Sequence, residues 1–352
     1  MSDEILMTSP KRIISFDGGG IRILMVIAFL NELLNERRLL DASFQIRDMV
    51  DIFIGTSAGT LLSCFLTYTV RTNESLLDIL LPDIINLFRT KAGPTSLIRP
   101  KYNKDKLATI LKKYFNDYTF KSPILTRKNM RDKNIMKDAP PLNIKTIRVF
   151  ATAYNVNTNA NYVFDSDDKD HHHLFVTDIC LASGSLPSYF PPIILTIPNR
   201  DEKNDHNTPT IFIDGGITCA NPLFQILMYE KGKLLKEYQS NTCQFLSIGT
   251  GRAIHKISEK DATTSSWGSL KWLNNGLLDM LSDHKHIDDA LDILLSGKNY
   301  LRLNTVIDVA HSSCDDTRID NIAYLIYKGK TLYWENHSKI WDWFGWNNNT
   351  HR

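Results

Sequence analysis

The segment Gly55-Thr56-Ser57-Ala58-Gly59 constrains this chain more than any other feature of its sequence. It follows the apolar run Met49–Ile54, which predicts a buried strand, and it leads into Ala58–Tyr68, which predicts a buried helix. A chain that passes directly from a strand into a helix must turn sharply at Ser57, and small flanking residues permit such a turn. The serine hydroxyl would then stand at a helix N-terminus, where the helix dipole favours negative charge.

The start of the chain shows the same order of elements. Arg12–Phe16 is a short β-prone run, Gly18-Gly19-Gly20 interrupts it, and Ile21–Leu40 continues with helical periodicity in which Leu24, Ala28 and Leu34 face inward. Further strands are predicted at Thr146–Ala153, Thr210–Ile213 and Gln244–Ile248. Strands that alternate with helices indicate parallel βαβ units, and hence an α/β fold whose sheet is covered by helices on both faces.

The glycines at 18–20 lie between a predicted strand and a predicted helix, where backbone N–H groups bind anions. The anion could be a phosphate or the oxyanion of an acyl-transfer intermediate. The dinucleotide-binding pattern G-x-G-x-x-G requires a glycine at position 23, which is Ile23, so the Rossmann fingerprint fails. We interpret the segment as an oxyanion-binding loop, with a nucleotide site and a purely structural turn as the alternatives.

Asp214-Gly215-Gly216 follows the apolar run Ile211-Phe212-Ile213. A carboxylate at a strand end, with glycines behind it, can approach another loop closely, although aspartate is also common in structural turns. Together with the two earlier motifs, this one predicts an acyl hydrolase in which Asp214 accepts the proton of Ser57 and no histidine takes part.

The histidines are the alternative candidates for the base. His171, His172 and His173 lie in a polar stretch and are predicted to form a solvated loop. No strand-end motif surrounds the other seven, which are His206, His255, His284, His286, His311, His337 and His351. A Ser-His-Asp triad of the α/β-hydrolase kind is the alternative mechanism.

Composition and charge argue against several other classes of protein. The formal net charge of +2 gives no overall attraction to nucleic acid. The five cysteines lie far apart without ligand spacing, which predicts free thiols in a reducing compartment and no metal site. Residues 1–10 lack an apolar core, so no signal peptide is predicted, and Ile52–Val70 fits a strand-turn-helix better than a membrane span. We expect a cytoplasmic or peripheral membrane location, with export by a route without a cleaved signal left open.

The motifs resemble those of a known family. D-G-G-G-x-R at Asp17–Arg22, G-x-S-x-G at Gly55–Gly59 and D-G-G at Asp214–Gly216 are similar, in this order, to the signature of patatin-like phospholipases. Further similar segments are Pro100-Lys101-Tyr102, Leu181–Pro192, Asn221-Pro222, Leu246–Gly251 and Asn299–Arg302. One position departs from the pattern, because Ile23 stands where the family usually has a small residue. We expect Ile23 to alter helix packing more than catalysis.

The resemblance implies a three-layer α/β/α fold with a Ser-Asp dyad, and a lipid acyl hydrolase of the phospholipase A or lysophospholipase type. Ser57 would be the nucleophile and Asp214 the general base, with an oxyanion hole formed by Gly18, Gly19 and Gly20. The supporting motif residues would be Asp17, Arg22, Gly55, Gly59, Gly215 and Gly216. The implied substrate is a phospholipid or another glycerolipid reached by transient contact with a membrane surface. No metal, organic cofactor or nucleic acid is implied, and an activator or an oligomer is left open.

We expect residues 10–330 to form the patatin-like domain and residues 331–352 to form an aromatic C-terminal tail, packed on the domain or appended to it. The aromatic residues of the tail, Trp341, Trp343, Phe344 and Trp346, could close the core or lie at a membrane interface. The basic segment Thr126–Lys145 could contact anionic headgroups or form a solvated loop. The polar segment Asn199–Thr210 is predicted to join two strands.

Two other functions compete with lipid hydrolysis. A carboxylesterase that acts on soluble esters through a triad would require an essential histidine. A catalytically inactive lipid-binding module would have no need for Ser57 or Asp214, so the presence of both residues argues against it.

Overall fold

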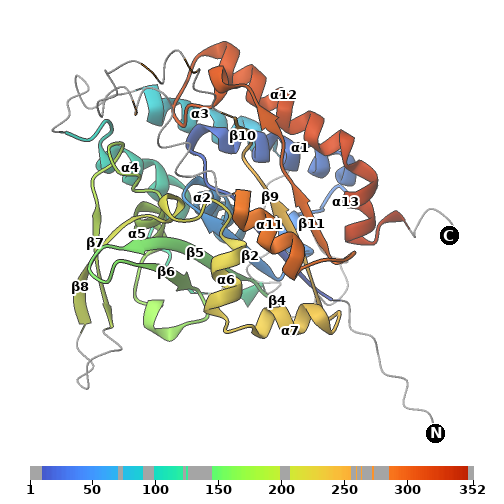
Figure 1. Ribbon diagram of the computed structural model, residues 1–352, viewed down its shortest axis with the longest axis horizontal. Coiled ribbons are helices and arrows are strands. Elements are labelled where there is room, and N and C mark those ends of the chain that lie inside the picture. The colour runs from blue at the N-terminus through green and yellow to red at the C-terminus, as the bar shows by residue number, and fades with distance from the viewer. Residues whose placement is uncertain are drawn as a thin grey trace, which may run out of the picture.

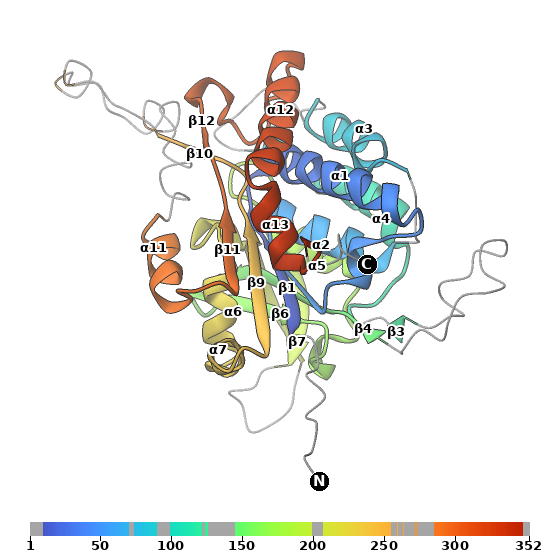
Figure 2. The same ribbon diagram turned by 90° about the vertical axis from the view of Figure 1, so that its right-hand side faces the viewer.

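A central β-sheet organises the chain, and helices cover both of its faces (Figure 1 and Figure 2). The computed structural model describes residues 10–69, 74–89, 99–121, 124–125, 145–198, 207–254, 259, 263, 272 and 285–347. The predicted basic segment lies almost wholly outside the described residues, as do residues 1–9 and 199–206.

The main sheet has the strand order β11-β9-β1-β2-β5-β8-β7, and β6 also pairs with β5. Its strands are β1 (Lys11–Phe16), β2 (Ile52–Thr56), β5 (Arg148–Asn155), β6 (Ala160–Asp165), β7 (Ile193–Pro198), β8 (Asn207–Asp214), β9 (Cys243–Ile248) and β11 (Tyr300–Leu303). The pairs from β11 to β5 are parallel, as predicted, whereas β6, β7 and β8 pair in antiparallel fashion. β8 runs antiparallel because it forms a hairpin with β7.

Two short strand pairs lie outside this sheet. β3 (Ile124–Leu125) pairs with β4 (Lys145–Thr146), and β10 (Arg252–Ala253) pairs with β12 (Val306–Ile307). The predicted polar connection Asn199–Thr210 was too long, because β8 already begins at Asn207 and contains Thr210.

Helices form the other two layers. One core contains residues of α1 (Ile23–Leu40), α2 (Ala58–Tyr68), α3 (Leu76–Arg89), α4 (Lys104–Phe115), α5 (Val176–Ser183), α12 (Ile319–Glu335) and α13 (His337–Phe344). The core on the opposite face contains residues of α6 (Leu223–Tyr229), α7 (Lys233–Gln239) and α11 (Lys285–Leu294). Figure 2 shows the sheet between these two groups of helices. The prediction of a three-layer α/β/α fold is therefore confirmed.

Helix α1 is more deeply buried than its periodicity predicted. Residues 23–31 are all buried, not only those of one inward side. The reason is a second cover, because α12 packs against α1 on the side away from the sheet (Figure 2). A side chain at Gly329 of α12 would lie 2.1 Å from the carbonyl oxygen of Met25, so glycine permits this close crossing.

Strand β5 aligns the two strands that carry the serine and aspartate motifs. β2 pairs with one edge of β5 as far as the partners Thr56 and Thr152. β8 arrives from the opposite direction, and its last residue, Asp214, pairs with Ala153. The end of β2 and the end of β8 therefore meet at neighbouring positions of β5.

The C-terminal aromatic residues pack back on the domain. Trp343, Phe344 and Trp346 are buried, and the indole nitrogen of Trp343 donates to the carbonyl oxygen of Phe245 in β9 at 3.1 Å. The rings of Phe344 and Trp346 stack with 4.2 Å between their centroids. In this arrangement the aromatic residues of α13 contribute to the core.

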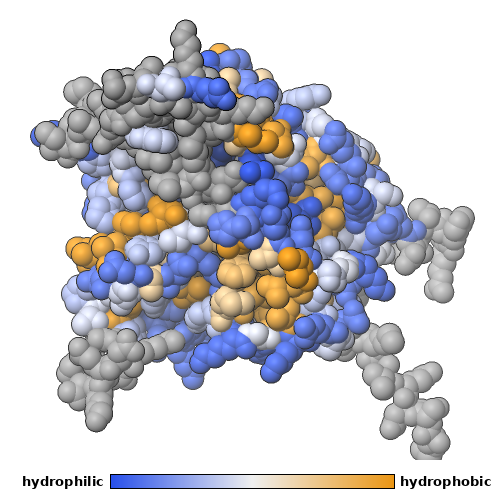
Figure 3. Space-filling view, viewed as in Figure 1, coloured by the Kyte–Doolittle hydropathy of each residue, from blue (hydrophilic) through white to orange (hydrophobic). Residues whose placement is uncertain are grey.

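The surface shown in Figure 3 carries its hydrophobic residues in separate patches among polar ones. Within the described ranges, no helix is both long enough and apolar enough to cross a membrane.

Replacing Trp343 by alanine should destabilise the fold by about 3–5 kcal/mol, because it leaves a cavity and removes the hydrogen bond to Phe245. Thermal denaturation would measure the loss. Tyr327→Ala is the matched control, because Tyr327 is 65% exposed on α12, and it should change stability by less than about 0.5 kcal/mol. A Trp343→Ala protein of unchanged stability that no longer binds lipid vesicles would contradict the packing role.

Candidate active site

Ser57 occupies a strained turn between β2 and α2. Its φ of 53° and ψ of −125° are unusual for a residue with a side chain. The amides of Thr60 and Leu61 both donate to the carbonyl oxygen of Ser57, which fixes the turn as the first turn of the helix. The serine is the N-cap residue of α2, so the positive end of the helix dipole lies beside its hydroxyl.

The structure brings the predicted nucleophile and the predicted base together. Ser57 Oγ donates a hydrogen bond to Oδ2 of Asp214 at 2.6 Å. The contact follows from the alignment on β5, because Ser57 is the first residue after β2 and Asp214 is the last residue of β8.

The Asp214 carboxylate is almost completely buried, with 2% of its surface exposed. Burial raises the pKa of this carboxyl to about 6, while the hydrogen bonds from Ser57 and from the Gly216 amide act in the opposite direction. The Gly216 amide donates to Oδ1 at 2.7 Å, which leaves Oδ2 for the serine. A carboxylate whose pKa is raised by burial is a stronger base than one in water.

Ser183, at the end of α5, holds the serine turn in place. Its Oγ donates to the carbonyl oxygen of Thr152 at 2.7 Å and accepts from the amide of Ser57 at 2.9 Å. Thr60 Oγ1 lies 2.7 Å from the same oxygen and must donate, because the only proton of Ser183 points to Thr152. Neither Ser183 nor Thr60 was among the predicted site residues, because their motif signal is weak.

The glycine loop lies against Ser57. A side chain at Gly18 would bring its Cβ within 3.2 Å of Ser57 Cβ, and Gly20 lines the same cavity as Ser57. Gly20 has a φ of +57°, and a Cβ there would lie 2.2 Å from the carbonyl oxygen of Cys314, so only glycine fits.

The three predicted oxyanion donors differ in their hydrogen bonds. The Gly18 amide donates to the carbonyl oxygen of Ala220 at 3.1 Å, so it is already occupied. For the amides of Gly19 and Gly20, no acceptor is found among the residues that the structure describes. Two of the three predicted donors therefore have N–H groups available.

A buried ion pair fixes the start of the loop. Arg302 of β11 contacts both carboxylate oxygens of Asp17, at 2.9 and 2.6 Å, and also contacts Asp288 at 3.0 Å. Burial alone would lower the pKa of Arg302, but Asp17 and Asp288 raise it above its ordinary value. The resemblance had pointed to the segment around Arg302 without assigning it this role. Arg22 is buried beside the loop, in keeping with a supporting role.

The remaining motif glycines lie at close approaches of the backbone. A side chain at Gly59 would lie 2.3 Å from the carbonyl oxygen of Phe16, where α2 crosses β1. A side chain at Gly55 would likewise meet Gly59, and a side chain at Gly215 would meet Thr152.

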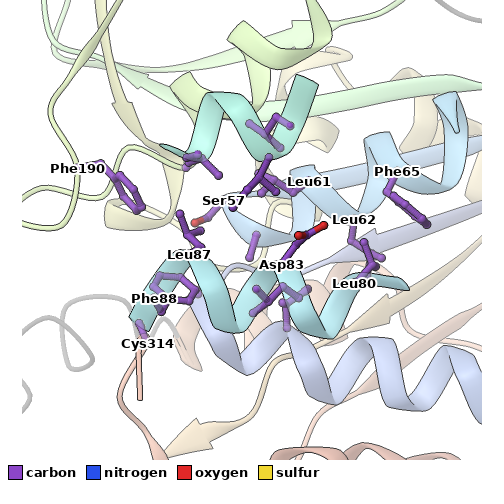
Figure 4. Close-up of a pocket in the computed structure, with 18 of the residues that line it drawn as sticks. Ser57, Leu61, Leu62, Phe65, Leu80, Asp83, Leu87, Phe88, Phe190 and Cys314 are labelled. Atoms are coloured by element: carbon purple, nitrogen blue, oxygen red, sulfur yellow. The ribbon is translucent and has the colours of Figure 1, made fainter. Parts of the chain in front are cut away.

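Ser57 opens into an apolar cavity (Figure 4). Side chains of α1, α2, α3 and α4 line it, together with Leu186, Tyr189 and Phe190 from the connection between α5 and β7. The isoleucine, leucine and phenylalanine residues that line it are Ile23, Ile27, Leu61, Leu62, Phe65, Leu80, Ile84, Leu87, Phe88, Leu107, Ile110, Leu111, Phe115, Leu186 and Phe190, and Asp83 and Tyr114 line it as well. Ile23 thus lines the cavity wall, so its unusual bulk affects the shape of the pocket as well as helix packing. An apolar cavity that begins at a nucleophile suits a hydrocarbon chain.

No histidine lines this cavity within the described part of the chain. The predicted solvated loop was wrong for His171, which is 1% exposed and bonds to the Tyr162 hydroxyl and the Asp165 backbone. The described residues also contain no group of three or more His, Cys, Asp or Glu side chains that could hold a metal ion.

A family model described as Patatin-like phospholipase matches residues 14–227, which is more than half of the chain. The chain belongs to the patatin-like phospholipase family. At the level of the family, this means a lipid-hydrolysing serine hydrolase.

Relatives of the chain are similar to it over most of its length, but at low sequence identity. Patatin-like protein 2 of Oryza sativa subsp. indica is 25% identical, over 95% of this chain and 87% of that protein. Patatin-2-Kuras 4 of Solanum tuberosum is 24% identical, over 91% of this chain and 85% of that protein.

Two crystal structures also match. VipD from Legionella pneumophila has a TM-score of 0.39 and 11% identity, over 93% of this chain and 66% of that one. ExoU from Pseudomonas aeruginosa, in complex with SpcU, has a TM-score of 0.32 and 14% identity. The match covers 82% of this chain and 53% of that one. This chain therefore spans about two thirds of VipD and about half of ExoU.

Ser183→Ala should slow the reaction of Ser57 roughly ten- to hundredfold, because the Ser57 amide loses its acceptor and the turn loosens. The rate of labelling by a fluorophosphonate would measure this. Ser185→Ala is the matched control, because Ser185 Oγ is equally buried but bonds to the carbonyl oxygen of Leu181. Equal labelling rates in both variants would contradict a positioning role for Ser183.

Asp214→Asn should be more stable than the wild type at pH 8, by up to about 3 kcal/mol. The pKa of Asp214 is raised to about 6 in the folded state, so the folded protein binds the proton more tightly than the unfolded chain. The protonated Asp214 carboxyl therefore contributes its full share to the free energy of unfolding below about pH 4. That contribution is lost as the pH rises through about 6. Denaturant unfolding at pH 5 and pH 8 would show the gap between variant and wild type widening with pH. A gap that narrows would mean that Asp214 is not destabilised by burial.

Proposed function

We propose that this protein cleaves fatty-acyl esters of glycerolipids, as a phospholipase A or lysophospholipase, through an acyl-enzyme on Ser57. The observation that carries the proposal is the short hydrogen bond from Ser57 Oγ to buried Asp214, at the mouth of an apolar cavity. A nucleophile with a base in contact meets the geometric requirement for covalent catalysis.

In the first half of the reaction, Asp214 accepts the Ser57 proton while Oγ attacks the ester carbonyl carbon. The carbonyl oxygen becomes an oxyanion, and we assign its stabilisation to the amides of Gly19 and Gly20, aided by the dipole of α2. The tetrahedral intermediate then expels the glycerol oxygen, which takes the proton from Asp214. A lysolipid leaves and the acyl group remains on Ser57.

In the second half, Asp214 removes a proton from water, and the resulting hydroxide attacks the acyl carbonyl. Collapse of the second tetrahedral intermediate releases the fatty acid, and Ser57 recovers its proton. One carboxylate can serve both halves because it alternates between accepting and returning one proton.

The membrane supplies the substrate in this proposal. The acyl chain would leave the bilayer and enter the cavity between α2 and α3 (Figure 4), where its burial contributes about 0.8 kcal/mol per methylene group. A transient contact with the bilayer surface is therefore part of the proposed function.

Fatty-acid release from mixed phospholipid vesicles should be measured for wild type, Ser57→Ala and Asp214→Ala, with the folding of each checked. Each substitution should lower the rate by roughly 10³-fold or more, because each removes one member of the proton-transfer pair. The wild-type kcat/KM should rise with pH through about 6, since Asp214 must be ionised to act as a base.

Other outcomes of this experiment would favour the competing functions. Retained activity in Asp214→Ala would point to a histidine base, and activity confined to soluble esters would point to a carboxylesterase. A wild type that is inert on every lipid, and whose Ser57 does not react with a fluorophosphonate, would point to an inactive lipid-binding module.

A further inference from the structure

We propose that Phe65 forms the far wall of the acyl cavity and sets the longest acyl chain that fits in it. This inference rests on the proposed function, because it assigns the cavity beside Ser57 to the acyl group of the substrate. It names a preferred substrate class, namely esters of medium-chain acids.

Two cavities lie one behind the other along α2. Ser57, Leu61 and Phe65 line the first cavity at successive turns of the helix, and Figure 4 shows them in this order. Phe65 also lines a second, smaller cavity, together with the adjacent Leu66 and with Thr69, the C-cap residue of α2. Among the described residues, Phe65 alone lines both cavities.

The neighbouring helices show the same order. On α3, which runs in the opposite direction, Phe88 to Leu80 line the first cavity and Leu76 lines the second. On α1, Ile23 and Ile27 line the first cavity and Leu34 lines the second. The lining residues of α1, α2 and α3 therefore indicate that the two cavities lie along one axis. The Phe65 ring lies between the two cavities.

The dividing ring is held from the side by α4. The rings of Phe65 and Tyr114 meet edge to face, with 5.3 Å between their centroids. The Tyr114 hydroxyl donates to the Asp83 carboxylate, which also pairs with Lys113 at 2.6 Å. Phe65 is 5% exposed, so close packing fixes its position.

The helix rise gives the depth of the first cavity. Ser57 and Phe65 are eight residues apart on α2, which corresponds to about 12 Å. An extended alkyl chain with bonds of about 1.5 Å advances roughly 1.25 Å per carbon, so about nine or ten carbons fit between the two residues. The second cavity measures about 20 Å³, enough for about one water molecule, so it adds length only when the ring is removed.

The test uses p-nitrophenyl esters from butyryl to palmitoyl, kept below the concentrations at which they form micelles. For the wild type, kcat/KM should rise about fourfold per methylene as far as decanoyl and then fall. Phe65→Ala joins the two cavities and adds roughly one helical turn, or about four carbons. Its optimum should move to myristoyl, and the ratio of myristoyl to decanoyl kcat/KM should rise at least about tenfold.

Further variants distinguish a change in the preferred acyl chain length from a general loss of activity. Phe65→Leu removes less volume and should give a smaller shift in the same direction, which keeps the test available if Phe65→Ala does not fold. Leu61→Phe adds a ring one turn from Ser57 and should move the optimum to shorter esters. Phe88→Ala removes an equal ring at the Ser57 end, so it should change the rate for all esters without moving the optimum.

Failure of this inference is distinct from failure of the proposed function. Ser57-dependent hydrolysis with an optimum that stays in place in both Phe65 variants would overturn the inference and leave the acyl hydrolase intact. An optimum that moves equally in Phe88→Ala would also overturn it. If no ester is hydrolysed, labelling of Ser57 by hexyl, decyl and hexadecyl fluorophosphonates gives the same comparison, and equal rates in wild type and Phe65→Ala would overturn it.

Discussion

The pairing of two strands with one edge of β5 underlies the whole candidate site. β2 occupies the edge up to Thr152 and β8 occupies it from Ala153 onward, in the opposite direction. Parallel strands alone would place two C-terminal ends side by side, whereas this mixed arrangement places them end to end. The contact between Ser57 and Asp214 is therefore set by backbone register, which is far more rigid than a contact between flexible side chains.

Burial of Asp214 links the stability of the fold to its chemistry. The carboxylate is held in a low-dielectric position by two hydrogen bonds, from Ser57 and Gly216, and its pKa is raised by burial. The ionised form is the one that can act as a base, and it is also the form that folding disfavours. Functional sites commonly hold groups in states that reduce the stability of the fold. The surrounding core, with α1 buried between the sheet and α12, supplies the stability that offsets it.

Local motifs revealed much of this site in the sequence, and long-range packing supplied the rest. The limits of α2 were predicted as observed, and Ser57, Asp214 and the glycine loop follow strands that the sequence indicated. Their signal is local, because a sharp turn between a strand and a helix requires particular residues at adjacent positions. The roles of Ser183, Arg302 and Phe65 did not follow from local sequence, since each acts through a contact with a distant segment. Ser183 and Arg302 do lie in segments that resemble the family, but the resemblance assigned them no role. The direction of β8 and the second cover on α1 were missed for the same reason.

The glycine loop at residues 18–20 also has supports that lie far along the chain. Thr250 Oγ1 donates to the carbonyl oxygen of Gly18, Arg302 holds Asp17, and the Cys314 carbonyl accepts from the amide of Ile21. All three supports follow residue 227, where the match to the family model ends. A fragment that keeps all three contacts is therefore longer than the region that the family model matches, and it must include Cys314. The C-terminal third of the chain thus holds in position a loop that belongs to its first two thirds.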